Sequence, residues 1–193
     1  MRTRTSRLAS VISLLACAVI LGGCASAAST PVFSDPIPVV PAPTVPSWFN
    51  VEMTDVTTGN AFKISDFAGQ VVLVDTMATW CPTCQGEMSQ VQQVPSLLGA
   101  SGKDLVLVSL DVDPNEDAAI LKKYATTNGF DWRIAVAPIE VGRFLETNYD
   151  QQYLNPPLQP MLFIDRTGGV YGLPFGIKSA SSIQLTLAQY LAK

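Results

Sequence analysis

The sequence predicts an α/β fold in which helices cover both faces of a central mixed β-sheet. Two observations lead to this prediction. Short apolar runs alternate with segments of helical periodicity between residues 71 and 164, which is typical of parallel strands joined by helices. The chain then continues with a hairpin pattern and a final amphipathic helix, which add antiparallel strands and a further covering helix.

The first elements place a strand directly before a helix. VEM and AFKI, separated by the turn-prone TTGN, predict a small N-terminal β-hairpin extension. The first core strand is VVLVD, residues 71–75, which is apolar enough to be buried on both faces. A helix is expected from Pro82 to about Leu98, with apolar residues at spacings of three and four. Pro95 should bend or end this helix near its last turn.

The remaining elements complete the sheet. DLVLVSLDV is the second core strand, and the helix after it is expected to begin at an Asn115 cap and to end at Gly129. WRIAVA predicts a short strand and VGRFLETNY a short helix. MLFID is the third core strand, RTGG a turn and VYG its partner strand. SIQLTLAQYLAK closes the chain as a helix capped by Ser181 or Ser182.

The N-terminus has the pattern of an export signal. Arginines at positions 2, 4 and 7 precede an uncharged, mostly apolar run over residues 8–21, which is short for a bilayer span of about 20 residues. The sequence LGGC resembles the lipobox of prokaryotic lipoproteins, and this resemblance implies that Cys24 is lipidated and becomes the first mature residue. Cys17 is a weaker second candidate, and an uncleaved anchor helix is the alternative. Either arrangement predicts a domain that is tethered to a membrane outside the cytoplasm.

Three segments follow from this pattern: a signal peptide over residues 1–23, a linker rich in Pro, Ala and Ser over 24–47, and one folded domain over 48–193. Proline-rich linkers are semi-rigid spacers, so this one is expected to hold the domain clear of the lipid surface. The net charge is −4, and nothing in the sequence resembles the basic patch that a nucleic-acid binder needs.

Cys81 and Cys84 are the two thiols expected to remain in the mature domain. A zinc site needs four ligands, and the chain has one C-x-x-C pair and no histidine. A purely structural disulfide would close a loop too short to stabilise the fold much. The redox interpretation explains more, because Cys81 falls at the start of a helix with Pro82 at its first position. The helix dipole and unpaired N–H groups there favour a thiolate. Cys81 is therefore the expected attacking sulfur, and Cys84, one turn further and better shielded, the resolving one.

The segment VVLVDTMATWCPTC resembles the active site of the thioredoxin superfamily, and ATWCPTCQGEM is most similar to its membrane-tethered TlpA/ResA branch. The match covers most of residues 48–193. It implies a thioredoxin-like fold and thiol–disulfide exchange, with no metal and no cofactor beyond the redox-active disulfide.

Asp75 matches the buried acid that accepts the proton of the resolving cysteine, although a solvated strand-end aspartate is the alternative. Pro160 matches the cis-proline that contacts substrate, with a loop proline as the alternative. Trp80 and Pro82 complete the expected substrate contacts, and Trp80 either shields the sulfurs or only packs.

Two positions depart from the pattern or add to it. The run from Pro160 to Asp165 is one residue shorter than in the family, which affects the register of the cis-proline. Glu87 matches an acidic position common in the TlpA branch, and a solvated helix face is its expected location.

The function implied by the resemblance is a lipid-anchored thiol–disulfide oxidoreductase that reduces exported proteins, for instance the cysteines of apocytochrome c, and is recharged by a membrane electron donor. Pro82 and Thr83 do not fix the direction of electron flow. A non-catalytic binding module is the main alternative. A thiol peroxidase is disfavoured because Ala78 stands where such enzymes place a threonine, and a copper-delivery protein because the chain has no histidine.

Overall fold

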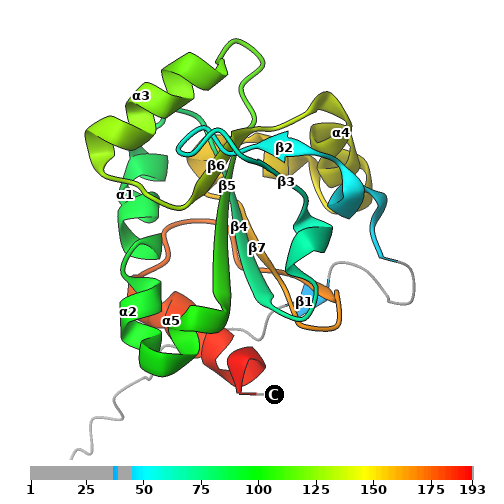
Figure 1. The fold of residues 1–193 in the computed structure, drawn as a ribbon, viewed down its shortest axis with the longest axis vertical. Helices are drawn as coiled ribbons and strands as arrows, with labels where there is room; N and C mark the ends of the chain where they lie inside the picture. The colour runs from blue at the N-terminus through cyan, green and yellow to red at the C-terminus, as the bar shows by residue number, and fades with distance from the viewer. Residues whose placement is uncertain (1–36, 39–44, 193) are drawn as a thin grey trace, which may run out of the picture. The chain divides into compact units, whose positions relative to one another are not determined.

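The computed structural model describes residues 37–38 and 45–192, and its main element is a mixed β-sheet (Figure 1). The sheet has six strands in the order β1-β8-β7-β4-β5-β6. Strands β4, β5 and β6 are parallel, and β7, β8 and β1 are added antiparallel on the other side of β4. The strands are β1 (Ile37–Pro38), β4 (Val71–Met77), β5 (Leu105–Asp111), β6 (Arg133–Val136), β7 (Met161–Ile164) and β8 (Val170–Gly172).

The expected N-terminal hairpin is present as β2 (Met53–Thr54) and β3 (Ala61–Phe62), which form a separate two-stranded sheet. The pairing of β1 with β8 brings Ile37 and Pro38, which lie within the segment expected to be a linker, to the edge of the main sheet. Pro38 is compatible with this place because an edge strand tolerates a residue without an N–H donor. Cys24, the expected lipid attachment site, and the expected signal peptide lie outside the described residues.

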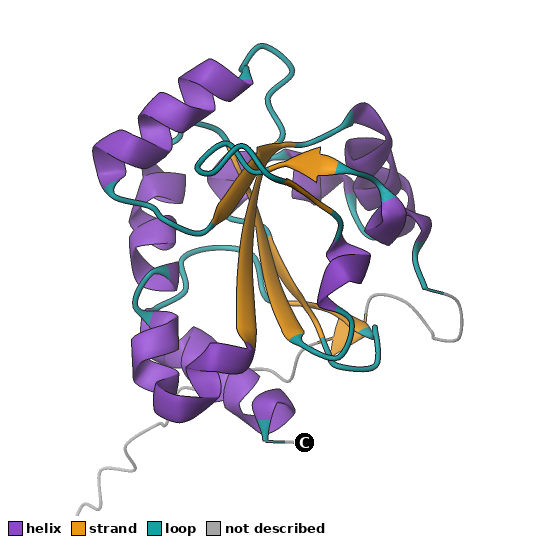
Figure 2. Ribbon diagram, viewed as in Figure 1, coloured by secondary structure: helices purple, strands orange, loops and turns teal. Residues whose placement is uncertain are grey.

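Helices lie on both sides of the sheet, as Figure 2 shows. The α-helices are α1 (Pro82–Val91), α2 (Val94–Leu98), α3 (Ala118–Asn128), α4 (Ile139–Asn148) and α5 (Ala180–Leu191). The 3₁₀ helices are η1 (Ser47–Asn50), η2 (Ile64–Phe67), η3 (Gly99–Asp104), η4 (Gln151–Leu154) and η5 (Pro156–Leu158). None of the helices in this described part of the chain has the length and hydropathy needed to cross a membrane.

Strand β4 is buried on both faces and supplies side chains to two hydrophobic clusters. Val71, Leu73 and Met77 pack in the cluster that also contains residues of α1, α2, α3 and α5. Val72 and Val74 pack in the other cluster, with residues of α4, η1 and η2. Because side chains alternate along a strand, Asp75 belongs to the face covered by α1, which is the helix that carries the cysteines.

The predicted elements are confirmed, with corrections at helix ends. The helix expected from Pro82 to Leu98 is divided into α1 and α2. Pro95 explains the break, because it has no N–H for the carbonyl of Val91 and its ring clashes with that carbonyl in a continuous helix. Gly129 ends α3 in the left-handed conformation, as expected, with φ of 69°.

Both predicted N-terminal caps are wrong by about two residues. Helix α3 is capped by Asp117 instead of Asn115, and α5 by Ser179 instead of Ser181 or Ser182. Asp, Asn and Ser all have side chains that accept hydrogen bonds from the free N–H groups at the start of a helix. Composition alone therefore does not choose between two such residues that lie this close together.

Candidate functional site

The two cysteines lie where β4 gives way to α1. Cys81 is the N-cap residue of α1, Pro82 occupies the first helical position, and Cys84 lies in the first turn. The cysteines are joined by a disulfide, with their Cα atoms 5.3 Å apart, as disulfide geometry requires. The expected position of the pair at a helix N-terminus is therefore correct.

The two sulfur atoms have opposite hydrogen-bonding environments. Cys81 Sγ accepts a hydrogen bond from the backbone N–H of Cys84 at 3.1 Å and lies 3.3 Å from the hydroxyl of Thr83. Cys84 Sγ lies 3.2 Å from the carbonyl oxygen of Pro156. Donors stabilise a thiolate, whereas a carbonyl acceptor stabilises a protonated thiol. After reduction, this arrangement favours a thiolate at Cys81 and a thiol at Cys84.

The expected difference in shielding between the cysteines is absent in the disulfide form. Cys81 is 1% exposed and Cys84 is 2% exposed, so both are buried. Their neighbouring donors and acceptors, rather than their exposure, distinguish the two sulfurs.

Asp75 is buried inside the sheet, and the alternative of a solvated strand-end aspartate is wrong. Its Oδ1 accepts a hydrogen bond from Ser109 at 2.7 Å, and the Ser109 hydroxyl in turn accepts one from the Trp132 indole at 2.8 Å. Burial raises the pKa of Asp75 to about 7, although the hydrogen bond from Ser109 and the charge of Lys178 act in the opposite direction. A carboxyl group with this pKa changes protonation near neutral pH and is suited to exchange a proton.

The expected cis bond before Pro160 is wrong, because no peptide bond among the described residues is cis. The chain turns instead at Gln159, which has a left-handed backbone with φ of 53°, and Met161 enters β7 immediately after Pro160. The Pro160 carbonyl is used by the sheet, where it accepts a hydrogen bond from the N–H of Thr76. It is the carbonyl of Pro156 that approaches Cys84.

Trp80 is exposed to 56% beside the disulfide. Its indole N–H donates a hydrogen bond to Asp113, and the backbone N–H of the preceding Thr79 donates to Glu116 at 2.8 Å. The loop before α3 therefore holds the approach to Cys81 in place. With this exposure Trp80 is not a core residue, and its contact with substrate stays a prediction.

The expected location of Glu87 on a solvated helix face is wrong. Glu87 is 4% exposed and forms an ion pair with Lys178, whose ammonium nitrogen lies 2.8 Å from Glu87 Oε1. The helical pattern did not reveal this burial, because Lys178 comes from the segment before α5, far along the chain.

Thr83, Gln159 and Lys178 are the residues near the disulfide that sequence reasoning missed. In the part of the chain that the structure describes, no group of three or more His, Cys, Asp or Glu side chains is placed to hold a metal ion.

Comparison with known proteins assigns the family. A family model described as Redoxin matches residues 34–168, more than half of the chain. A thiol:disulfide interchange protein of the thioredoxin family from Chlorobium tepidum superposes with a TM-score of 0.62 at 24% identity, over 82% of this chain and 98% of that one.

Two further solved structures share the fold. MTB dsbF superposes with a TM-score of 0.58 at 20% identity, over 76% of this chain and 99% of that one. BsSco, a member of the Sco family of cytochrome c oxidase assembly proteins, superposes with a TM-score of 0.59 at 18% identity, over 82% of this chain and 96% of that one. At these identities the structures establish a thioredoxin-like fold, and the family model assigns the chain to a family. The chain therefore belongs to the Redoxin family, and its fold is thioredoxin-like.

Proposed function

We propose that this protein is a membrane-tethered reductant of disulfides in exported proteins, with Cys81 as the attacking and Cys84 as the resolving cysteine. The single observation that carries the assignment of the two cysteines is the opposite environment of their sulfurs. Cys81 Sγ faces an N–H and a hydroxyl, whereas Cys84 Sγ faces a carbonyl oxygen. Since the thiolate is the nucleophile in thiol–disulfide exchange, the sulfur that faces donors attacks first.

The reaction has two displacement steps. The Cys81 thiolate attacks one sulfur of a substrate disulfide, which forms a mixed disulfide and releases the other substrate sulfur as a thiolate. Cys84 then attacks Cys81 Sγ, which breaks the mixed disulfide, forms the Cys81–Cys84 disulfide and releases the second substrate thiolate. The substrate gains two electrons and the protein loses two. A dithiol donor, expected to be a membrane electron carrier, returns the protein to its reduced form.

Asp75 is the proton acceptor of the second step. Cys84 must lose its proton to attack, and Asp75 is a buried carboxyl on the sheet face that α1 covers. Its pKa of about 7 means that it is substantially ionised at and above neutral pH and accepts a proton there. We assign Trp80, which is exposed to 56%, and Pro82, at the first position of α1, to contact with the substrate chain.

The cellular setting rests on the N-terminal sequence. The arginines, the apolar run and LGGC support export and lipidation at Cys24, with residues 24–47 as the linker to the domain. Oxidised cysteine pairs of exported proteins, such as those of apocytochrome c, are the substrate class that this location supplies. Partition of a Cys24→Ala variant into the aqueous phase of a detergent extract, with the wild type in the detergent phase, tests the anchor.

Reduction of insulin disulfides tests the activity. The wild type should accelerate insulin reduction by a dithiol, and the Cys81→Ser variant should not. A wild type no faster than this variant would favour a non-catalytic binding module. The Cys84→Ser variant should accumulate a mixed disulfide with its substrates, and mass spectrometry of trapped species should find them attached to Cys81.

A further inference from the structure

Lys178 is a buried cation next to α1, the helix that begins at the disulfide. It is 2% exposed, and its ammonium nitrogen lies 2.8 Å from Glu87 Oε1 on α1. The same nitrogen donates hydrogen bonds to three carbonyl oxygens, of Gln159 at 2.8 Å, Gly176 at 2.7 Å and Pro174 at 3.2 Å. A buried lysine keeps its charge only when it has such partners, so this site is built around a charged ammonium group.

Gln159 extends these contacts to the disulfide. Its side chain is buried, and its Nε2 donates a hydrogen bond of 3.1 Å to the carbonyl of Thr83, the residue before Cys84. The contacts therefore run from Thr83 to Gln159, on to Lys178, and back to α1 through Glu87. Gln159 holds a left-handed backbone to make them, which is uncommon for a residue other than glycine. The first turn of α1 is thus tied to the segment before β7 and to the segment before α5.

The charge of Lys178 also acts on both buried carboxyl groups. Burial raises the pKa of Glu87 to about 7 and that of Asp75 to about 7, and Lys178 lowers both values. Asp75 and Glu87 repel each other when both are ionised, which raises the pKa of Glu87 further. Tyr124 on α3 also faces Asp75, and its pKa is raised to about 12, mainly by burial, so it stays neutral at neutral pH. Cys81 and Cys84 also titrate at this site when they are reduced.

We propose that Lys178 is a positioning residue of the redox site, because its ammonium group ties α1 to the segment before β7 and balances the charges of Glu87 and Asp75. This inference rests on the proposed resolving step, in which Asp75 takes the Cys84 proton. Without Lys178, Asp75 would hold its proton to a higher pH and would accept the Cys84 proton less often. Lys178 then governs the pH range of that step without touching the substrate.

The resolving step can be measured by itself with dithiobis(nitrobenzoate), an aromatic disulfide whose thiolate product is coloured. The Cys81 thiolate of the reduced protein displaces one nitrothiobenzoate in the first phase and keeps the other as a mixed disulfide. Cys84 displaces the second nitrothiobenzoate in the second phase, and its proton passes to Asp75. The rate of the second phase, measured against pH, therefore reports the ionisation of the acceptor.

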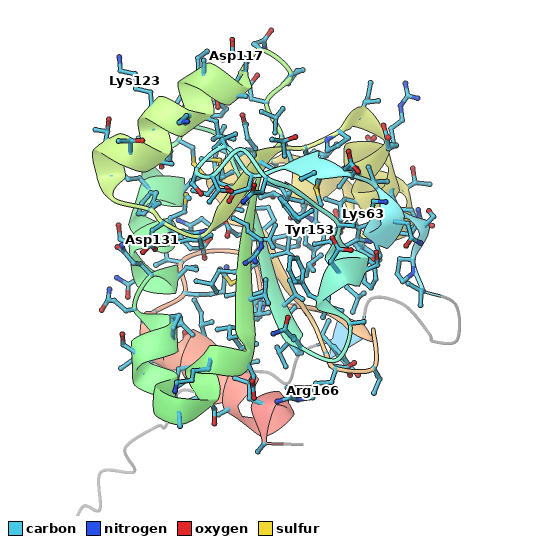
Figure 3. All side chains as sticks on the ribbon, in the orientation of Figure 1. Lys63, Asp117, Lys123, Asp131, Tyr153 and Arg166 are labelled. Carbon is cyan, nitrogen blue, oxygen red and sulfur yellow. A yellow bond between two sulfur atoms is a disulfide. The ribbon has the colours of Figure 1, made fainter. Side chains whose placement is uncertain are left out.

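The rate of the second phase falls at low pH, where the acceptor is protonated. In Lys178→Met this fall should occur at a higher pH than in the wild type. A rise of one unit in the acceptor pKa would slow this phase about fivefold at pH 7. Glu87→Gln should move the fall to lower pH, because it removes a negative charge beside Asp75. The double variant Lys178→Met/Glu87→Gln removes one charge of each sign and should return close to the wild-type profile. Lys123→Met is the matched control, since this lysine points away from the molecule on α3 (Figure 3), and its profile should equal that of the wild type.

The outcomes separate this inference from the proposed function. A Lys178→Met profile equal to that of the wild type, with only a lower melting temperature, would make Lys178 a purely structural residue and overturn the inference. If Lys178→Met does not fold, Glu87→Gln decides, and an unchanged profile there overturns the inference equally. A wild type that shows no second phase at all would instead refute the proposed resolving role of Cys84.

Discussion

At the scale of single residues, Thr83 makes the most consequential contact. It occupies a variable position between the two cysteines of the motif. Its hydroxyl lies 3.3 Å from Cys81 Sγ, and its carbonyl is held by Gln159. The sequence places Thr83 between the cysteines without saying where its hydroxyl points. The structure directs it to the sulfur of Cys81, where it adds a second donor to the backbone N–H of Cys84.

Thr83→Val should therefore raise the pKa of the Cys81 thiol, because valine keeps the shape of threonine but has no hydroxyl. A hydrogen bond of about 1 kcal/mol corresponds to roughly a fivefold smaller thiolate population near neutral pH. The measurement is the rate of alkylation by iodoacetamide against pH, in a Cys84→Ser background that leaves one thiol. Thr126→Val is the control, since the Thr126 hydroxyl bonds within the exposed face of α3. Equal pH midpoints for Thr83→Val and its parent would show that the hydroxyl does not stabilise the thiolate.

At the scale of elements, strands and helices are positioned by short-range signals, and their ends depend on single caps. Strands β4 and β5 each begin with four consecutive apolar residues, as expected for strands buried on both faces. Helix α3 begins at Asp117, whose Oδ1 accepts hydrogen bonds from the N–H groups of Ala119 and Ile120, both at 2.9 Å. The cap matters because the loop before α3 also holds Thr79 and Trp80 through Glu116 and Asp113.

Asp117→Ala should lower the free energy of unfolding by about 1 kcal/mol, since it removes the acceptor for both N–H groups. Asn115→Ala is the matched comparison, because the sequence suggested Asn115 as the cap and the structure leaves it outside the helix. The free energy of unfolding should fall clearly less in Asn115→Ala than in Asp117→Ala. Urea denaturation of the two variants measures both values. A larger loss for Asn115→Ala would place the helix start where the sequence suggested and contradict the structure.

The sequence was sufficient for the parts of the site that are local. Cys81, Pro82 and Cys84 are close together in the chain, and an apolar run followed by a helical pattern places them at a strand-to-helix junction. Asp75 could also be predicted, because it lies within the same apolar run. These predictions rest on spacing of a few residues, where chain geometry leaves little freedom.

The parts that failed depend on contacts between distant segments. Glu87 looked solvated because its partner, Lys178, is 91 residues away, and no periodic pattern joins them. Two charged residues seldom share a core, so each alone favours an exposed position. The cis bond expected at Pro160 was carried over from a resemblance in which the strand begins one residue later. In this chain the turn before the strand falls at Gln159, whose φ is 53°.

At the scale of the whole molecule, the buried acids that surround the redox motif oppose folding at neutral pH. Asp75, Glu87 and Asp111 are each buried, and mainly for that reason their pKa values are raised to about 7. Between pH of about 4 and about 7, the folded chain keeps protons that the unfolded chain has released. The free energy of unfolding therefore falls as pH rises through this window. The same burial that gives Asp75 a useful pKa makes the domain less stable.

Asp75→Asn should separate these two effects. An amide does not ionise, and its oxygen still accepts the Ser109 hydrogen bond, so the variant should be more stable than the wild type above pH 7. The gain should reach up to about 4 kcal/mol for a shift of about three pKa units and disappear near pH 4. The same variant should release the second nitrothiobenzoate at least about tenfold more slowly at pH 8, because it has no carboxylate to take the Cys84 proton. Urea denaturation of the oxidised protein from pH 4 to pH 8 gives the first value, with the exposed Asp131→Asn as control. A stability difference that does not change with pH would mean that Asp75 ionises in the folded protein as it does in the unfolded chain, and it would then have no distinctive capacity to accept the proton.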